Sequence, residues 1–144
     1  RPLEFHCTSP VKATRAQEIL YGRSLRPFLC GELIGQALLD KSTSKPGLVV
    51  TDQSALLAAR EFATVPVVLV NEEPESQQAH QGDAGEQPGG HKGRSFSLGT
   101  YRATLPDDYQ SDRPSLDLLW QGVSDLDMVE PFQRIREAIQ ETQA

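Results

Sequence analysis

The segment "LVVTDQSALLAAREFATVPVVLVNEE", Leu48 to Glu73, carries the strongest fold signal in the chain. Two apolar, Val-rich runs, 47–50 and 65–70, lie on either side of a stretch rich in Ala and Leu. Neither run alternates polar with apolar residues, which is typical of strands buried on both faces of a parallel sheet. The stretch between them favours a helix, because Ala and Leu are good helix formers and Asp52 or Ser54 can cap its first turn. The segment therefore predicts a strand, a helix and a second strand parallel to the first.

Similar patterns predict further elements on both sides of this unit. Leu3, Phe5 and Cys7 alternate with polar residues, as in a strand, and Ser9 followed by Pro10 is a typical start of a helix. We expect strands over 2–8, 94–105 and 115–123, and helices over 9–23, 26–41 and 125–143. Together these elements predict an α/β protein: a three-layer, Rossmann-like sandwich with a mostly parallel sheet of about five strands and a C-terminal helix.

The domain organisation follows from length and composition. A chain of 144 residues has the size of one ordinary domain, so we expect a single α/β domain over 1–144. The segment "NEEPESQQAHQGDAGEQPGGHKG", 71–93, contains no large apolar residue. It cannot bury enough surface to offset the entropy of ordering, so we expect a long, mobile loop over 72–93.

Charge and hydropathy restrict the classes of partner. The chain has 14 Lys and Arg against 20 Asp and Glu, a net charge of −6. Such an acidic domain repels phosphate backbones and anionic lipid, so we expect neither nucleic acid nor a membrane as partner. No apolar run reaches the about 18 residues of a membrane span, and the N-terminus lacks the pattern of a signal peptide. We expect a soluble, cytoplasmic protein, and the absence of an initial Met indicates processing or a longer parent chain.

The cysteine content fits the same compartment. Cys7 and Cys30 fit either one disulfide or two free thiols, and buried free thiols are the expectation for a reducing compartment. No Cys and His residues have the spacing of metal ligands, so we expect no metal site.

A candidate ligand crevice follows from the predicted topology. In open α/β sheets, ligands bind beyond the carboxyl ends of the strands, beside helix N-termini whose dipole favours anions. The residues that this rule selects are His6, Thr8, Ser9, Thr51, Asp52 and Asn71. The alternative is that these side chains serve only as helix caps and ordinary loop residues.

The motifs of several enzyme classes are absent. The sequence contains neither G-x-x-x-x-G-K-[ST] nor G-x-G-x-x-G, so no cofactor can be assigned. The carboxylate pairs 72–73 and 107–108 fall in predicted loops, where solvation is the usual state of Asp and Glu. No Ser/His/Asp set can be argued either, because "HCTS" lacks the glycines of a nucleophile elbow.

One family resemblance adds an enzymatic alternative. "FHCTS" (5–9), followed by "AQEILYGRSLRP" (16–27), resembles the opening of ADP-ribosyltransferases, where a strand carries H-x-T. "GLVVTDQSALLAAREFA" (47–63) resembles their second block, although Val49 and Val50 stand where the family has an aromatic residue. The resemblance implies that His6 and Thr8 contact NAD.

Three functional hypotheses remain open, and so does the question of enzymatic activity. The first is a non-catalytic α/β module that binds a protein partner or a small-molecule ligand. The alternative is an ADP-ribosyltransferase-like enzyme that uses NAD. The third is an assembly component that pairs through an edge strand over 96–104, with Tyr109 or Trp120 as an interface anchor; the oligomeric state is not determined.

Overall fold

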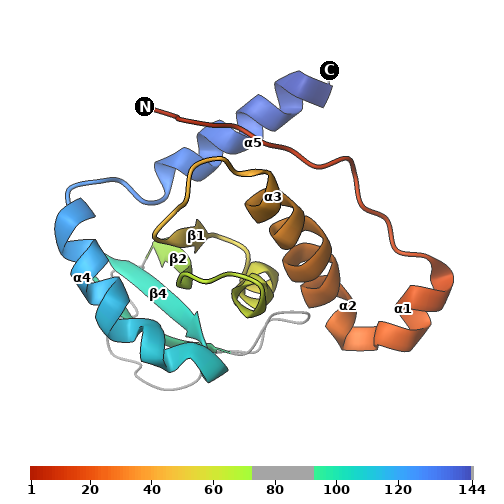
Figure 1. Cartoon of the computed structure of the whole chain (residues 1–144), viewed down its shortest axis with the longest axis horizontal. Helices are drawn as coiled ribbons and strands as arrows, with labels where there is room; N and C mark the ends of the chain where they lie inside the picture. Colours follow the sequence, from red (N-terminus) through yellow and green to blue (C-terminus); the bar gives the residue numbers. More distant parts are fainter. Residues whose placement is uncertain (73–92, 144) are drawn as a thin grey trace.

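A four-stranded mixed sheet lies at the centre of the molecule (Figure 1). The structure is a computed structural model that describes residues 1–72 and 93–143. The strands are β1 (Val49–Thr51), β2 (Val67–Glu72), β3 (Gly93–Leu98) and β4 (Tyr101–Pro106), in the order β1-β2-β4-β3. Only β1 and β2 are parallel, while β2/β4 and β4/β3 are antiparallel. The prediction of a mostly parallel, five-stranded Rossmann-like sheet is therefore wrong.

Helical segments cover both faces of this sheet (Figure 1). They are α1 (Arg15–Tyr21), η1 (Gly22–Ser24), α2 (Leu25–Pro27), η2 (Phe28–Gly35), α3 (Gln36–Lys41), η3 (Ser54–Glu61), η5 (Asp107–Asp112), α4 (Arg113–Val123) and α5 (Glu130–Gln143). The segments from η1 to α3 follow one another without a break, and η2 has π-helical geometry. The predicted loop 72–93 lies outside the described residues except for its two ends, which belong to β2 and β3.

Strand β2 is buried on both faces, as its unbroken apolar sequence predicts. Val68 packs in one cluster with Leu116 of α4, whereas Leu69 packs in another with Leu57 of η3. Each of these side chains is at most 8% exposed. The parallel β1/β2 pair and the two-sided burial are the parts of the prediction that the structure confirms.

Two glycines allow η2 to pack closely against η3. A Cβ atom added at Gly31 would lie 2.6 Å from the Cβ of Ala58, and one at Gly35 would lie 3.0 Å from the Cβ of Ala59. Neither glycine has a positive φ, so the requirement is for space and not for conformational freedom. Both glycines, which are weak helix formers, therefore have a packing role in this helical segment.

The predicted first strand over 2–8 does not form. The chain before α1 is extended and unpaired, and the side chains of Leu3 and Phe5 are 82% and 48% exposed. Alternation alone cannot make a strand stable, because the strand also needs a partner edge and a face to bury. The segment 1–14, which we call the N-terminal arm, instead runs past α5 and the turn after α3 and continues outside the body of the domain to α1 (Figure 1).

Helix α1 begins later than predicted. A capping box sets its start: the Thr14 hydroxyl accepts from the Gln17 N–H at 3.2 Å, and the Gln17 side chain accepts from the Thr14 N–H at 3.0 Å. This reciprocal pair satisfies two backbone donors, so Thr14 replaces Ser9 as the cap. Gly22, with φ of 53°, ends the helix as expected.

The segment 115–123, predicted as a strand, is part of helix α4. The period-two reading places Leu116, Leu118 and Trp120 on one face, but Leu118 is 71% exposed. Leu116 and Trp120, one helical turn apart, instead pack in the cluster beside the sheet, with Leu116 fully buried. Pro114 stands in the first turn, where a helix tolerates proline.

The segment 94–105, predicted as one strand, is a hairpin of β3 and β4. The two strands pair from Leu98 and Tyr101 outward, so Gly99 and Thr100 form a two-residue turn. Gly99 has φ of 62°, which a glycine adopts at little cost. The predicted single alternating strand is therefore wrong: the glycine reverses the chain, and residues 103–106 of β4 are all buried instead of alternating.

We expect Gly31→Ala to lower the free energy of unfolding by about 1–3 kcal/mol, because the new methyl group must displace the Ala58 backbone. Gly122→Ala in α4 is the matched control, since nothing lies within 4 Å of its added Cβ. This control should raise the stability by about 0.5–1 kcal/mol through helix propensity. Urea unfolding measures both, and equal effects of the two substitutions would contradict the packing role of Gly31.

Candidate functional site

The predicted crevice residues at the strand ends serve the fold. The buried Thr51 hydroxyl accepts from the Gln53 N–H at 3.0 Å and closes the turn after β1. The carboxylate of Asp52 pairs with Arg136, which anchors α5 at this end of β1. Asn71 is exposed in β2, opposite Arg102 of β4.

The other predicted site residues lie on the N-terminal arm. His6, Thr8 and Ser9 occupy its extended part, and the His6 ring lies 2.8 Å from the Glu4 carboxylate of the same arm. No hydrogen bond within the described ranges joins these residues to Thr51, Asp52 or Asn71. The strand that should carry His6 and Thr8 according to the ADP-ribosyltransferase resemblance is not formed.

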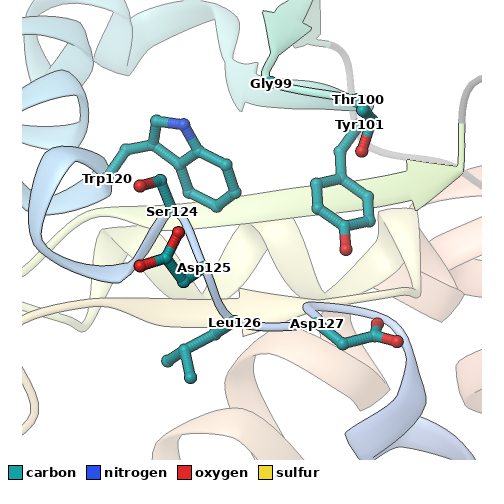
Figure 2. A pocket seen from close by; sticks show the side chains of 8 residues that line it. All are labelled: Gly99, Thr100, Tyr101, Trp120, Ser124, Asp125, Leu126 and Asp127. Carbon is teal, nitrogen blue, oxygen red and sulfur yellow. The ribbon is translucent and has the colours of Figure 1, made fainter.

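A different part of the molecule holds a pocket of about 360 Å³ (Figure 2). It lies between the β3–β4 turn, the end of α4 and the segment that leads into α5. Its lining consists of Gly99, Thr100, Tyr101, Trp120, Ser124, Asp125, Leu126 and Asp127. We call it the aromatic pocket.

Two aromatic rings at a right angle form the wall of the aromatic pocket. The centroids of Tyr101 and Trp120 lie 6.0 Å apart with an interplanar angle of 88°. Gly99 allows the turn to approach the indole closely, because an added Cβ would lie 2.9 Å from the Trp120 ring. The hairpin turn thus fixes the position of Tyr101 relative to Trp120.

The segment after α4 supplies the polar side of the pocket. Figure 2 shows the carboxylate of Asp125 below the indole and that of Asp127 below the Tyr101 hydroxyl. This hydroxyl accepts from the Met128 N–H at 3.3 Å, which ties the strand to the start of α5. Two aromatic faces and two carboxylates therefore border one open space.

Asp127 also caps the start of α5. Its carboxylate accepts from the backbone N–H groups of Glu130 at 3.0 Å and Val129 at 2.9 Å. These two bonds favour the charged form and hold the pKa of Asp127 below its ordinary value, with a smaller contribution from Tyr101. The pocket consequently keeps this negative charge throughout the neutral range.

The lining of the aromatic pocket consists of aromatic, small, apolar and acidic residues. It contains no His, Cys or Lys, so none of its described residues can pair a nucleophile with a neutral base. Across residues 1–72 and 93–143, no three His, Cys, Asp or Glu side chains gather as metal ligands would. The carboxylates of the pocket can attract a positive charge, and its two aromatic rings can provide flat apolar contacts.

A second pocket, of about 390 Å³, lies beside α2 and η3. Its charged lining residues, Arg23, Glu32 and Glu61, have both signs, and Phe28 stacks on Tyr21 at 4.3 Å. This mixture does not define one class of ligand.

Sequence reasoning missed the aromatic pocket because its parts come from distant segments. The prediction of a strand over 115–123 assigned Trp120 to a sheet, and Asp125 and Asp127 to the start of the last helix. One available signal was that Trp120 is the single tryptophan of the chain and lies only five residues before an acidic pair, Asp125 and Asp127. The proximity of Tyr101 could not be read from the sequence.

Comparisons with known proteins give no relative. No protein-family model matches the sequence, and neither the curated proteins nor the solved structures contain a significant match. None of the helices in the described part of the chain has both the length and the apolar character of a membrane span.

The capping role of Asp127 predicts a pH dependence that Asp127→Ala should remove. Because the folded pKa is lowered, the carboxylate adds stability above the unfolded pKa of about 3.9, and this contribution is lost as the pH falls through the folded value. Thermal unfolding should show a lower Tm for the variant at pH 7 and a difference that shrinks steadily below about pH 4. Asp108→Asn, which changes an exposed carboxylate of η5, is the control; a Tm difference that persists unchanged to pH 2 would contradict the assignment.

Proposed function

We propose that the domain is a non-catalytic binding module whose aromatic pocket receives a cationic side chain of a protein partner. The observation that carries this proposal is the perpendicular pair of Trp120 and Tyr101 beside the carboxylates of Asp125 and Asp127. An ammonium or guanidinium group is attracted by the negative face of an aromatic ring, and the attraction grows when water is excluded.

The chain already uses this interaction twice within its own fold. The guanidinium carbon of Arg113 lies 3.6 Å from the ring centroid of Phe96, and that of Arg60 lies 4.3 Å from the centroid of Tyr109. Among the described residues, no such internal cation covers Trp120 or Tyr101. Both rings are partly exposed and line the pocket, so we propose that a cation from another molecule contacts them there.

The charge of the site and of the whole domain supports the same class of ligand. Asp125 and Asp127 place two carboxylates at the pocket, and the chain carries a net charge of −6. A field of this sign speeds the approach of a basic partner and repels an acidic one. The negative charge of the pocket would thus disfavour acidic partners, and its shape would then distinguish among basic ones.

Leu126 favours a side chain on a polypeptide over a free small cation. It lines the aromatic pocket and is 58% exposed, so it offers an apolar contact beside the rings. The hydrocarbon stem of a lysine can cover such a surface while its charged head reaches the aromatic pair. A methylated lysine fits best, because its ammonium group loses less hydration on entering the pocket.

The NAD-dependent alternative gains no comparable support. His6 contacts Glu4 on the exposed N-terminal arm, and neither His6 nor Thr8 lines a described pocket.

A peptide carrying trimethyllysine should quench or shift the fluorescence of Trp120, the single tryptophan of the chain. The same peptide with a neutral tert-butyl isostere, in which carbon replaces the charged nitrogen, should bind at least about fivefold more weakly, as expected for loss of a cation–π contact. Titration by fluorescence and by calorimetry measures both. Equal binding of the two peptides, or no binding of either, would overturn the proposal.

Variants locate the binding at the aromatic pocket. Trp120→Leu should abolish binding in calorimetry, and Asp125→Asn should weaken it about two- to fivefold. Asp108→Asn is the matched control for Asp125→Asn, because it changes the net charge equally at an exposed position outside the pocket. If both Asp variants weaken binding equally, the effect comes from the overall charge and not from this site.

A further inference from the structure

One side chain holds the N-terminal arm to the body of the domain. The Glu4 carboxylate accepts hydrogen bonds from the Thr43 N–H at 3.1 Å, the Ser44 N–H at 2.5 Å and the Ser44 hydroxyl at 2.6 Å, and it also accepts from the Thr43 hydroxyl. The Ser44 and Thr43 hydroxyls lead the causes that hold the pKa of Glu4 well below its ordinary range, followed by His6. Apart from the Thr14–Gln17 capping box at its junction with α1, no other side-chain hydrogen bond joins the described arm to the rest of the described domain, so this set of contacts is the latch of the arm.

The latch lies on an exposed turn that carries hydroxyl groups. Thr43 and Ser44 are exposed in the turn after α3, between Lys41 and Lys45. The Ser42 hydroxyl donates to the Ser44 carbonyl at 2.7 Å and stabilises the turn. Ser44 has the less crowded, primary hydroxyl and is followed by the exposed residues 45–47, so it is the better nucleophile for an enzyme that approaches from solvent.

We propose that Ser44 is a phosphorylation site and that its phosphorylation releases the N-terminal arm. In this step the Ser44 oxygen attacks the γ-phosphorus of ATP, the bond to the β-phosphate oxygen breaks, and ADP leaves. The hydroxyl proton passes to the general base of the protein kinase. The product is a phosphate ester, and the hydroxyl group of Ser44 that donated a hydrogen bond to Glu4 is lost.

Electrostatic repulsion explains why phosphorylation of Ser44 would open the latch. A phosphoserine carries about −1.5 to −2 charge at pH 7 and no longer donates to a carboxylate. It therefore repels Glu4, and the neighbouring lysines, Lys41 and Lys45, provide alternative partners for the phosphate. The released segment would carry Leu3 and Phe5, whose side chains are already largely exposed.

The hydrogen bonds of the latch also affect how fast Ser44 is phosphorylated. In the closed state the Ser44 hydroxyl is bonded to Glu4, so the kinase must act on the open state. Phosphorylation then keeps the arm open, because the phosphate on Ser44 repels the Glu4 carboxylate in the closed state. Glu4→Gln, which removes the charge of the acceptor, should accordingly speed phosphorylation.

The position of the arm can be measured as a distance between two nitroxide labels in the full chain. One label is placed on the exposed Cys7 of the arm and the other on α4, in a Cys30→Ser, Gln121→Cys background. We expect a narrow distance distribution for the unmodified chain and a broad one when phosphoserine is installed at position 44. Phosphoserine at position 115, in the exposed first turn of α4, is the control for added charge and should leave the distribution narrow.

Access of a kinase is tested separately. A serine kinase is chosen because it phosphorylates the isolated peptide 38–48 at Ser44, and it is then applied to the full chain with Mg²⁺ and ATP. Mass spectrometry should find phosphate on Ser44, formed at least about threefold faster in Glu4→Gln than in the unmodified sequence, as expected for loss of a charge-assisted hydrogen bond. Glu32→Gln, an exposed carboxylate of η2, is the matched control. The proposal would be overturned if Ser44 stayed unphosphorylated in both the original sequence and the Glu4→Gln variant. It would also be overturned if the distance distribution stayed narrow with phosphoserine at position 44.

Discussion

The two-sided burial of β2 is the constraint on which the rest of the structure depends. Its side chains alternate between two apolar clusters, one with α4 and one with η3. A strand of this kind is stable only when both faces are covered, because each exposed Val or Leu would forfeit about 1.5–3 kcal/mol of burial. The parallel partner β1, the antiparallel partner β4 and the helices on both sides are therefore all arranged around one strand.

The periphery is held by different forces. Helix α5 has no buried side chain from 130 to 142, and it is fixed by the Asp127 cap and the Arg136–Asp52 ion pair. The N-terminal arm depends on Glu4 in the same way. Exposed polar contacts contribute little stability compared with apolar burial, so these segments can separate from the domain without unfolding its core. The proposed switch at the arm and the proposed binding site at the core edge therefore rest on separate sets of contacts.

The aromatic pocket lies where the core meets the periphery. Tyr101 and Trp120 pack against the cluster around Val68, so the core positions their rings, while Asp125 and Asp127 belong to the link between α4 and α5. A rigid aromatic wall beside a charged segment is suited to recognition, because the wall is preorganised and little side-chain entropy is lost on binding. The Asp127 cap couples the pocket to the start of α5, since the same carboxylate takes part in both.

Short-range patterns in the sequence predict the strand–helix–strand order that ends at Glu72 and the burial of β2, because these depend on neighbours in the chain, although the helix between the strands has 3-10 geometry. Only the tertiary structure decided the identity of 115–123, where Leu116, Leu118 and Trp120 fit a strand period and only the sheet selects the helical face that is buried. The arm likewise has the alternation of a strand but no partner edge. His6 and Thr8 of the candidate crevice lie on the arm because the first strand is missing, and the aromatic pocket escaped prediction because the Gly99 turn brings Tyr101 and Trp120 together. Local patterns fix local hydrogen bonds and periodicity, whereas contacts between distant segments depend on which surfaces the whole chain can bury together.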